Sequence, residues 1–146
     1  PVPNPSPTSN SPNGFTPQSG CTWWADNQRP DIVWYARQVN PNAYNWTAYM
    51  WASYAQAAGF SVDNTPAVGD IVVWQRGAEA SWLGDWGVTS DANVDSTTGH
   101  VAYVTAVNPD DTFNLTESGA DEAGHFSSKR EVSATVGSPQ FIHSRS

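Results

Sequence analysis

The chain has 146 residues, which is the length of one domain with a single hydrophobic core. Hydrophobic residues make up 38% of the chain and include eight tryptophans, so the sequence can fill such a core. The net charge of −8 argues against nucleic-acid binding, and no apolar stretch reaches the roughly 20 residues that insertion into a membrane requires.

Residues 1–13, PVPNPSPTSNSPN, form the first segment and contain almost no apolar side chains. A segment of this composition cannot bury enough surface to fold, so we predict an extended linker followed by a folded domain at residues 14–146. No signal-peptide pattern follows Pro1, so we expect the mature segment of an exported protein.

The first predicted helix begins at Gly20 or Cys21, with Ser19 as its cap, and ends before Pro30. Cys21 is the only cysteine, so no internal disulfide can form. Unpaired N–H groups in the first turn of a helix stabilise a thiolate, which favours a reactive Cys21. The alternative is a buried thiol that acts as a small hydrophobic side chain.

A second helix is predicted at residues 41–58, with Asn40 as the cap, Pro41 in the first helical position and Gly59 as the stop. Apolar residues recur there at spacings of three and four, which is typical of one buried helix face. These residues are Tyr44, Ala48, Trp51, Ala55 and Ala58.

The second half of the chain predicts strands. Side chains that favour strands are concentrated in residues 69–75, 100–107 and 112–118, and more weakly in residues 126–133 and 140–144. The sequence NPDD at 108–111 provides a turn, so the second and third of these strands are predicted to form a hairpin. Residues 76–99 predict a long polar loop. Helices followed by antiparallel strands predict an α+β fold.

A reactive thiol needs a base, and His100 is the first candidate. It opens a predicted strand directly after Gly99, where the backbone can approach a neighbour closely. In the hairpin, position 100 falls roughly opposite positions 117–119, so the Glu117 carboxylate can orient the imidazole.

His125 and His143 are alternative bases, although neither has an equally placed acidic partner in the sequence. The histidines and the cysteine lack the short spacings of structural zinc sites, so we predict neither a metal nor another cofactor.

Three blocks of the sequence together resemble the CHAP domain, the cysteine- and histidine-dependent amidohydrolase/peptidase family of bacterial cell-wall hydrolases. The blocks are CTWW at 21–24, TPAVGDIVVW at 65–74, and GHVAYV at 99–104 followed by TES at 116–118. They occur in the family's order, and the resemblance extends over about residues 14–144.

The resemblance implies a papain-like fold, with N-terminal helices packed on an antiparallel sheet. It also implies that Cys21 attacks an amide carbonyl, that His100 acts as base and then as acid, and that Glu117 orients the imidazole. The implied substrate is peptidoglycan, cut either between muramic acid and L-alanine or within the stem peptide and cross-bridge. We accordingly expect a secreted, monomeric enzyme of the cell wall, with a separate wall-binding domain beyond the linker.

The chain departs from the family pattern near the catalytic residues. Gly20 stands directly before the cysteine, where the family often has glutamine, and we expect Gln18 to compensate as an oxyanion donor. Gly119 stands where the family often has asparagine, and Asp121 is the candidate substitute. The stretch 76–99 also replaces a short turn.

Several residues around the catalytic groups are expected to bind the substrate: Gln18, Trp23, Trp24, Trp82, Trp86, Gly99 and Gly119. Adjacent helical residues point in different directions, so at most one of Trp23 and Trp24 lines the groove. We expect the stretch 76–99 to form one wall of the cleft, and anchoring of its tryptophans in the core is the alternative.

Residues 10–20 contain no acidic side chain, so the calcium loop of some phage-derived family members is not expected. Two other functions remain open at this point. One is a cysteine amidase acting on a small amide outside the cell wall or in a toxin, and the other is a wall-glycan-binding module without catalysis.

Overall fold

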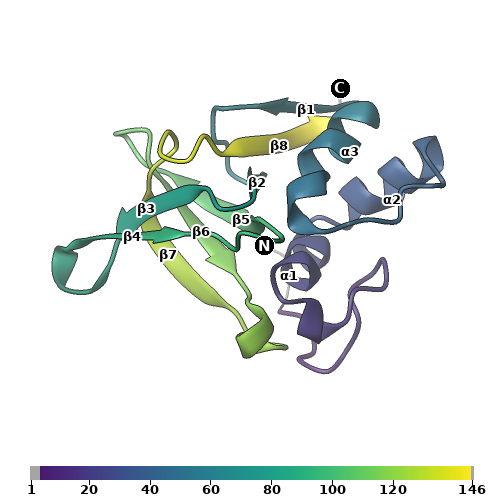
Figure 1. The fold of residues 1–146 in the computed structure, drawn as a ribbon, viewed down its shortest axis with the longest axis horizontal. Coiled ribbons are helices and arrows are strands. Elements are labelled where there is room, and N and C mark those ends of the chain that lie inside the picture. The colour runs from purple at the N-terminus through teal and green to yellow at the C-terminus, as the bar shows by residue number, and fades with distance from the viewer. Residues whose placement is uncertain (1–3, 146) are drawn as a thin grey trace.

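The computed structural model describes residues 4–145, which form three α-helices packed against one eight-stranded sheet (Figure 1). The strands lie in the order β1-β8-β2-β5-β6-β7-β3-β4, and every neighbouring pair is antiparallel. The predicted α+β class is confirmed.

The helices are α1 (Cys21–Gln28), α2 (Pro30–Val39) and α3 (Trp51–Ala57). Short 3-10 turns lie at Pro17–Ser19, Ala48–Met50, Asp85–Gly87 and Ala120–Glu122. The strands are β1 (Phe60–Asp63), β2 (Ile71–Trp74), β3 (Glu79–Leu83), β4 (Thr89–Asn93), β5 (His100–Val107), β6 (Phe113–Glu117), β7 (Ser127–Val132) and β8 (Gln140–Arg145).

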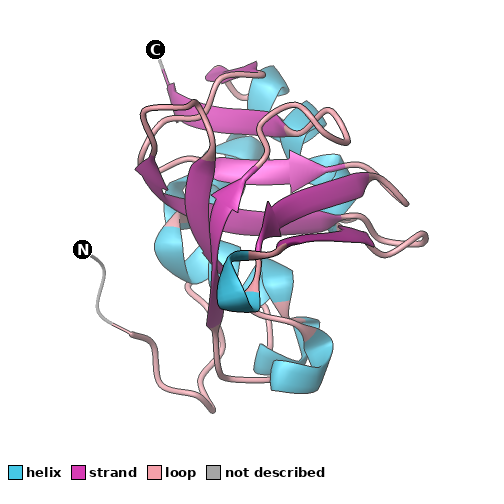
Figure 2. Ribbon diagram, turned by 90° about the vertical axis from the view of Figure 1, so that its left-hand side faces the viewer, coloured by secondary structure: helices cyan, strands magenta, loops and turns pink. Residues whose placement is uncertain are grey.

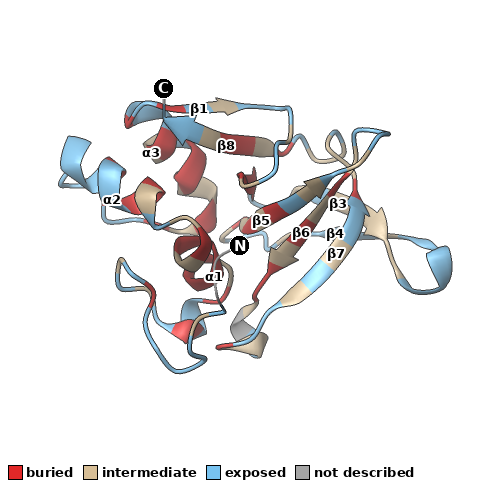
Figure 3. Cartoon of the chain, turned by 180° about the vertical axis from the view of Figure 1, so that it is seen from behind, coloured by how far each residue is buried: buried red, intermediate tan, exposed pale blue. Residues whose placement is uncertain are grey.

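The centre of the sheet is buried on both faces. Side chains alternate along a strand, so Ile71 and Val73 of β2 pack under the helices, whereas Val72 and Trp74 face the opposite side. The helices lie behind the strands in Figure 2, and the buried residues in Figure 3 gather where α1 and α3 meet the sheet. A second cluster, which includes Phe113, fills the other face. The central strands therefore form a rigid support for side chains at their ends.

The first predicted helix is confirmed as α1, although its cap is Gly20 and not Ser19. Residue Gly20 has a φ of 66°, a conformation that glycine adopts without strain. The sequence prediction missed α2, because Pro30 starts that helix as its first residue. Proline thus separates two helices here where we expected it only to end one.

The second predicted helix is wrong over residues 41–47, which form a loop, and α3 begins only at Trp51. Asn40 ends α2, and a proline directly after it disfavours helical geometry at this position. The side chain of Asn45 accepts hydrogen bonds from the backbone and hydroxyl of Thr47, which stabilises a turn in place of a helix. Gly59 follows α3 as predicted, and the strand β1 after it was missed.

The predicted loop 76–99 is also wrong, because it contains the hairpin of β3 and β4. Most side chains of β3 and β4 are exposed or half-buried, so these strands lack the alternation of apolar and polar residues that marks a strand in a sequence. The hairpin was missed for this reason. The turn of this hairpin protrudes from the sheet on the side away from the helices (Figure 1).

The later part of the segment expected to be a linker lies against α1. Asn13 donates to the buried Asp26 from its backbone and its side chain, both at 2.8 Å. The Trp23 indole donates to the Ser9 carbonyl at 2.8 Å. Residues 9–13 therefore complete the hydrogen bonds of two buried side chains. Within residues 4–145, no helix is long and apolar enough to cross a membrane.

Candidate active site

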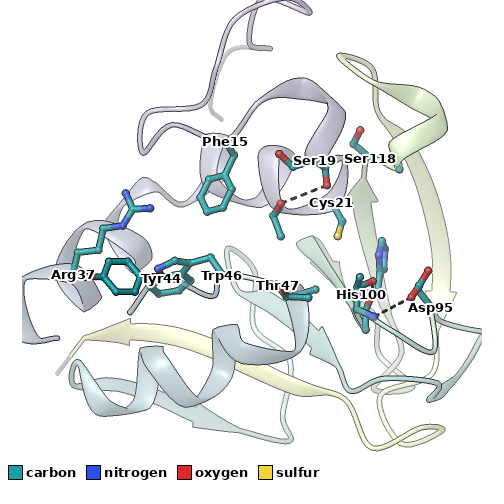
Figure 4. A pocket seen from close by; sticks show the side chains of 15 residues that line it. Phe15, Ser19, Cys21, Arg37, Tyr44, Trp46, Thr47, Asp95, His100 and Ser118 are labelled. Atoms are coloured by element: carbon teal, nitrogen blue, oxygen red, sulfur yellow. Dashed lines mark hydrogen bonds between the residues drawn. The ribbon is translucent and has the colours of Figure 1, made fainter. Parts of the chain in front are cut away.

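A cavity of about 560 Å³ lies between the start of α1, the loop after α2, the start of β5 and the end of β6 (Figure 4). Its walls combine aromatic, hydroxyl and charged groups with the only thiol of the chain. The lining residues are Phe15, Ser19, Cys21, Thr22, Arg37, Tyr44, Trp46, Thr47, Ala48, Asp95, Thr98, Gly99, His100, Ser118 and Gly119.

Cys21 is the first residue of α1 and is half-buried in the cavity wall. Strand β5 packs against α1, so groups from both elements surround the thiol. His100 and the backbone N–H groups of Val101 and Thr22 lower the pKa of the thiol. Donors of this kind, at a helix N-terminus, stabilise sulfur in its negative form.

His100 begins β5, and its ring links Cys21 to Glu117. The Nε2 atom lies 2.7 Å from Oε1 of Glu117, which leaves Nδ1 to face the thiol. The ring also stacks on Trp74, with the ring centroids 6.0 Å apart. The structure therefore brings together the three residues that the sequence proposed as catalytic.

Opposing effects set the pKa values of these groups. Burial tends to raise the pKa of the Cys21 thiol, but its hydrogen bond to His100 and the imidazolium charge bring it below its usual value. Burial tends to lower the pKa of His100, and the hydrogen bonds to Cys21 and Glu117 outweigh this and raise it to about 10. Burial tends to raise the pKa of Glu117, and His100 and Lys129 hold it at about 2. The lowered pKa of Cys21 and the raised pKa of His100 both favour a thiolate beside an imidazolium.

Sequence reasoning missed Lys129, whose ammonium forms an ion pair with Oε2 of Glu117. It also missed Ser118, which has a fully buried hydroxyl without a hydrogen-bond partner among the described residues and lines the cavity. The weak strand pattern of residues 126–133 gave no register for Lys129. The position of Ser118 directly after Glu117 was the one available signal.

Two of the glycines that were expected to contact substrate do line the cavity, namely Gly99 and Gly119. Gly99 has a φ of +69°, and a Cβ atom there would lie 2.5 Å from the carbonyl oxygen of Trp74. This close approach is the one that the sequence predicted. A Cβ atom on Gly119 would lie 2.8 Å from Oδ1 of Asp121, so this carboxylate stands next to the cavity.

The other residues expected to contact substrate lie elsewhere. Gln18 is exposed in the turn before α1 and does not line the cavity. Trp23 and Trp24 are buried, and Trp24 stacks on Phe126 with the ring centroids 4.4 Å apart. Both indoles fill the core because their N–H groups have acceptors inside the fold, as the hydrogen bond of Trp24 to Thr116 shows.

Trp82 and Trp86 do not line the cavity either. Trp82 is half-buried under Lys129, and Trp86 is 99% exposed in the turn between β3 and β4. Only the end of the stretch 76–99 reaches the cavity, through Asp95, Thr98 and Gly99. The expected cleft wall is thus limited to the residues just before β5.

The alternative histidines lie outside the cavity. His125 is exposed. His143 on β8 lies between two carboxylates, with Nε2 2.6 Å from Asp63 and Nδ1 2.8 Å from Asp70. The sequence offered no equally placed acidic partner for His143, and the fold supplies two, from β1 and from the turn before β2.

The described part of the chain contains no group of three or more His, Cys, Asp or Glu side chains arranged to hold a metal ion. The carboxylate of Asp26 accepts hydrogen bonds from the backbone and the side chain of Asn13.

Comparison with known proteins places this geometry in a family. The CHAP domain profile matches residues 10–119, and the chain belongs to the CHAP domain family. The start of the match at residue 10 includes the segment that packs on α1.

Two individual proteins are similar to the chain. A 68-residue stretch, 47% of the chain, is 41% identical to 23% of a Streptococcus mutans serotype c protein whose name classes it provisionally as a hydrolase. The crystal structure of an N-acetylmuramoyl-L-alanine amidase from Staphylococcus aureus superposes with a TM-score of 0.56 at 25% identity. That match covers 87% of the chain and 31% of the amidase. The chain thus spans less than a third of either relative.

Proposed function

We propose that the chain is the catalytic domain of a peptidoglycan hydrolase that cleaves an amide bond with Cys21 as the nucleophile. The observation that carries this proposal is that Cys21 and His100 line the same cavity, with the His100 ring hydrogen-bonded to Glu117 on its other side. Membership of the CHAP family and the likeness to a staphylococcal amidase support it.

In the first step, the Cys21 thiolate attacks the carbonyl carbon of the amide and forms a C–S bond. The carbonyl electron pair moves to oxygen, and the N–H of Cys21 at the start of α1 donates to this oxyanion. When the tetrahedral intermediate collapses, the C–N bond breaks and Nδ1 of His100 gives its proton to the leaving amine. The product on the enzyme is a thioester.

In the second step, His100 removes a proton from water, and the hydroxide oxygen attacks the thioester carbonyl. The C–S bond breaks, the acid product leaves, and the thiolate and the imidazolium are restored. Glu117 holds the ring through Nε2 in both steps, so Nδ1 stays directed at the sulfur.

The two ends of the cavity carry opposite charges. Arg37 and Tyr44 lie at one end, and Asp95 lies beside His100 at the other (Figure 4). Oδ1 of Asp95 is held by the backbone N–H groups of Thr97 and Thr98, at 2.7 and 2.9 Å. A peptide with an amino group on one side of the scissile amide and a carboxylate on the other complements this arrangement.

Stem peptides carry such groups, which favours peptidoglycan over an uncharged amide. Under this proposal the enzyme acts as a secreted monomer at the cell wall. Because the domain is acidic, attachment to anionic wall polymers is assigned to a separate domain.

The test is digestion of purified peptidoglycan of several cross-link types, followed by mass spectrometry of the soluble products. Free stem peptides with intact glycan strands indicate amidase activity, and split cross-bridges indicate endopeptidase activity. The Cys21→Ala variant is the matched control and is expected to release neither product. Equal cleavage by this variant would disprove the thiol mechanism, and binding to peptidoglycan without any cleavage by the native chain would indicate a binding module.

A further inference from the structure

The carboxylate of Glu117 has a charged partner on each of its two oxygens. Oε1 lies 2.7 Å from His100 of β5, and Oε2 forms an ion pair with the ammonium of Lys129 on β7. Strand β7 pairs with β6 so that Lys129 lies opposite Leu115, two residues before Glu117. Lys129 and Glu117 therefore share one face of the sheet as diagonal neighbours.

The Lys129 ammonium is in turn held from a third strand. Its Nζ atom lies 4.8 Å from the ring centroid of Trp82 on β3, within the range of a cation–π interaction. Strand β3 pairs with β7 through Leu83 and Arg130, which fixes the indole beside the lysine. The order of contacts is thus Trp82, Lys129, Glu117 and His100.

These contacts lie on the far side of the catalytic pair from the substrate. Glu117, Lys129 and Trp82 line a small separate cavity of about 130 Å³, whereas none of them lines the large one. His100 lines both. Neither Lys129 nor Trp82 can therefore touch a substrate in the large cavity, and any effect on catalysis passes through Glu117.

We propose that Lys129 and Trp82 are positioning residues, in which Trp82 holds the Lys129 ammonium against Oε2 of Glu117 so that Oε1 stays directed at His100. A carboxylate with one partner can rotate, and a second charged partner on the other oxygen stops this rotation. The Lys129 side chain is 30% exposed, and the carboxylate of Glu117 and the indole face of Trp82 are the partners of its ammonium. The hairpin of β3 and β4 thereby supports the catalytic residues from behind.

The first readout does not require any hydrolytic activity. The charged groups that face Glu117 are His100 from β5 and Lys129 from β7, and both lower its pKa. Titration of the Glu117 carboxyl carbon by NMR should show a higher pKa in Lys129→Met and a smaller rise in Trp82→Ala. Lys129→Arg and Trp82→Phe, which keep the charge and the aromatic face, should titrate close to the native chain. Lys129→Gln replaces Lys129→Met if the latter does not fold.

Trp86→Ala is the matched control, because Trp86 belongs to the same hairpin but is 99% exposed. It should leave the pKa of Glu117 unchanged. Since Trp82 acts through the lysine, the double variant Trp82→Ala/Lys129→Met should titrate like Lys129→Met alone. An unchanged Glu117 pKa in Lys129→Met, or equal shifts in Trp86→Ala and Trp82→Ala, would overturn the inference.

The kinetic readout rests on the proposed function. With peptidoglycan as substrate, Lys129→Met should lower kcat about tenfold and leave KM unchanged, and Lys129→Arg should restore most of the loss. A rise in KM at constant kcat would assign Lys129 to substrate binding and contradict the positioning role. If the native chain cleaves no peptidoglycan, the proposed function fails, while the NMR titration still decides the role of Lys129.

Discussion

His100 and Glu117 are 17 positions apart in the sequence, and the Nε2 atom of the imidazole lies 2.7 Å from Oε1 of the carboxylate. The hairpin of β5 and β6 produces this contact, because its register places the end of β6 beside the start of β5. The same strand, β5, packs against α1 and so directs the other side of the ring at Cys21. One hairpin and one helix therefore assemble the site.

The first prediction concerns the reactivity of the thiol as a function of pH. The pKa of Cys21 is lowered and that of His100 is raised to about 10, so the thiolate should persist to a lower pH than that of an ordinary cysteine. Cys21 is the only thiol, so the rate of iodoacetamide labelling, followed by mass spectrometry, reports on it alone. In His100→Gln the midpoint of the plot of labelling rate against pH should move to a higher pH than in the native chain. Burial then raises the pKa of Cys21 without the opposing imidazolium charge. His125→Gln is the control and should titrate like the native chain.

The second prediction concerns the alkaline limit of activity. In the proposed mechanism the His100 imidazolium supplies the proton for the leaving amine, so peptidoglycan cleavage should fall as the pH rises through about 10. Glu117→Gln removes a negative charge that helps to hold this proton on His100, so the alkaline limb of the pH-rate profile should move to lower pH. The value of kcat should also fall about 100-fold. A pH-rate profile at saturating substrate measures both effects. An alkaline limb that stays in place in Glu117→Gln would contradict the assigned role.

The third prediction tests the charges at the two ends of the cavity. Asp95→Asn keeps the oxygen that accepts from Thr97 and Thr98, so the loop should hold its shape while the negative charge is lost. The variant should raise KM up to about tenfold for substrates with a free amino group, with little change for acetylated ones. Arg37→Gln should do the same for substrates with a free carboxylate.

Asp91→Asn on β4 is the control for Asp95→Asn, because Asp91 is exposed and does not line the cavity. Its kinetics with both sets of substrates should match those of the native chain. Equal KM changes for the amino and acetylated substrates in Asp95→Asn would show that the Asp95 carboxylate does not bind the amino group of the substrate.

The parts of the site that were predicted from sequence depend on local signals. A cap region followed by a helix located Cys21, and the turn at 108–111 fixed which residues of β5 and β6 face each other. In that hairpin the amide of Asn108 and the carbonyl of Thr112 form a 2.8 Å hydrogen bond, as the turn pattern requires. Short-range geometry was therefore enough to pair His100 with Glu117.

The missed parts depend on contacts that no local pattern encodes. Lys129 reaches Glu117 only because β7 adds to the edge of β6 in one register, and residues 126–133 have no alternation that fixes it. His143 meets Asp63 from 80 positions away, through the pairing of β1 with β8. The start of α2 was lost for a different reason, since Pro30 fits both the end of one helix and the first position of the next.

The fourth prediction concerns the segment that composition describes as a linker. Asn13→Ala removes the side-chain hydrogen bonds to Asp26 and to the Pro30 carbonyl, and leaves the backbone donor in place. Because Asp26 is buried and its pKa is raised mainly by burial, a lost donor is costly. We expect the free energy of unfolding to fall by about 2 kcal/mol, measured by urea denaturation. Asn10→Ala is the control, because Asn10 is an exposed residue of the same segment, and it should leave the free energy of unfolding unchanged. If Asn13→Ala also left it unchanged, the segment would be a free linker.

The fifth prediction concerns the contribution of His143 to the free energy of unfolding. The imidazole lies between Asp63 and Asp70, and the Arg29 guanidinium donates a hydrogen bond to the backbone carbonyl of His143. Burial tends to lower the pKa of His143, and the two carboxylates outweigh this and raise it above 6.5. A raised pKa stabilises the fold fully below pH 6.5, and this contribution is lost as the pH rises through the folded value. The lowered pKa of Asp63 gives a contribution that is present above pH 3.8 and lost on acidification.

His143→Gln should therefore reduce the free energy of unfolding most between about pH 4 and 6.5, and the difference from the native chain should shrink as the pH increases. The pKa of Asp70 is raised by burial, in contrast to the lowered pKa of Asp63. Ionisation of Asp70 therefore destabilises the fold unless the His143 imidazolium is there to compensate its charge. Urea denaturation at a series of pH values measures the difference, with the exposed His125→Gln as control. Parallel curves for His143→Gln and the native chain from pH 4 to 9 would show that this ion cluster does not contribute through its protonation.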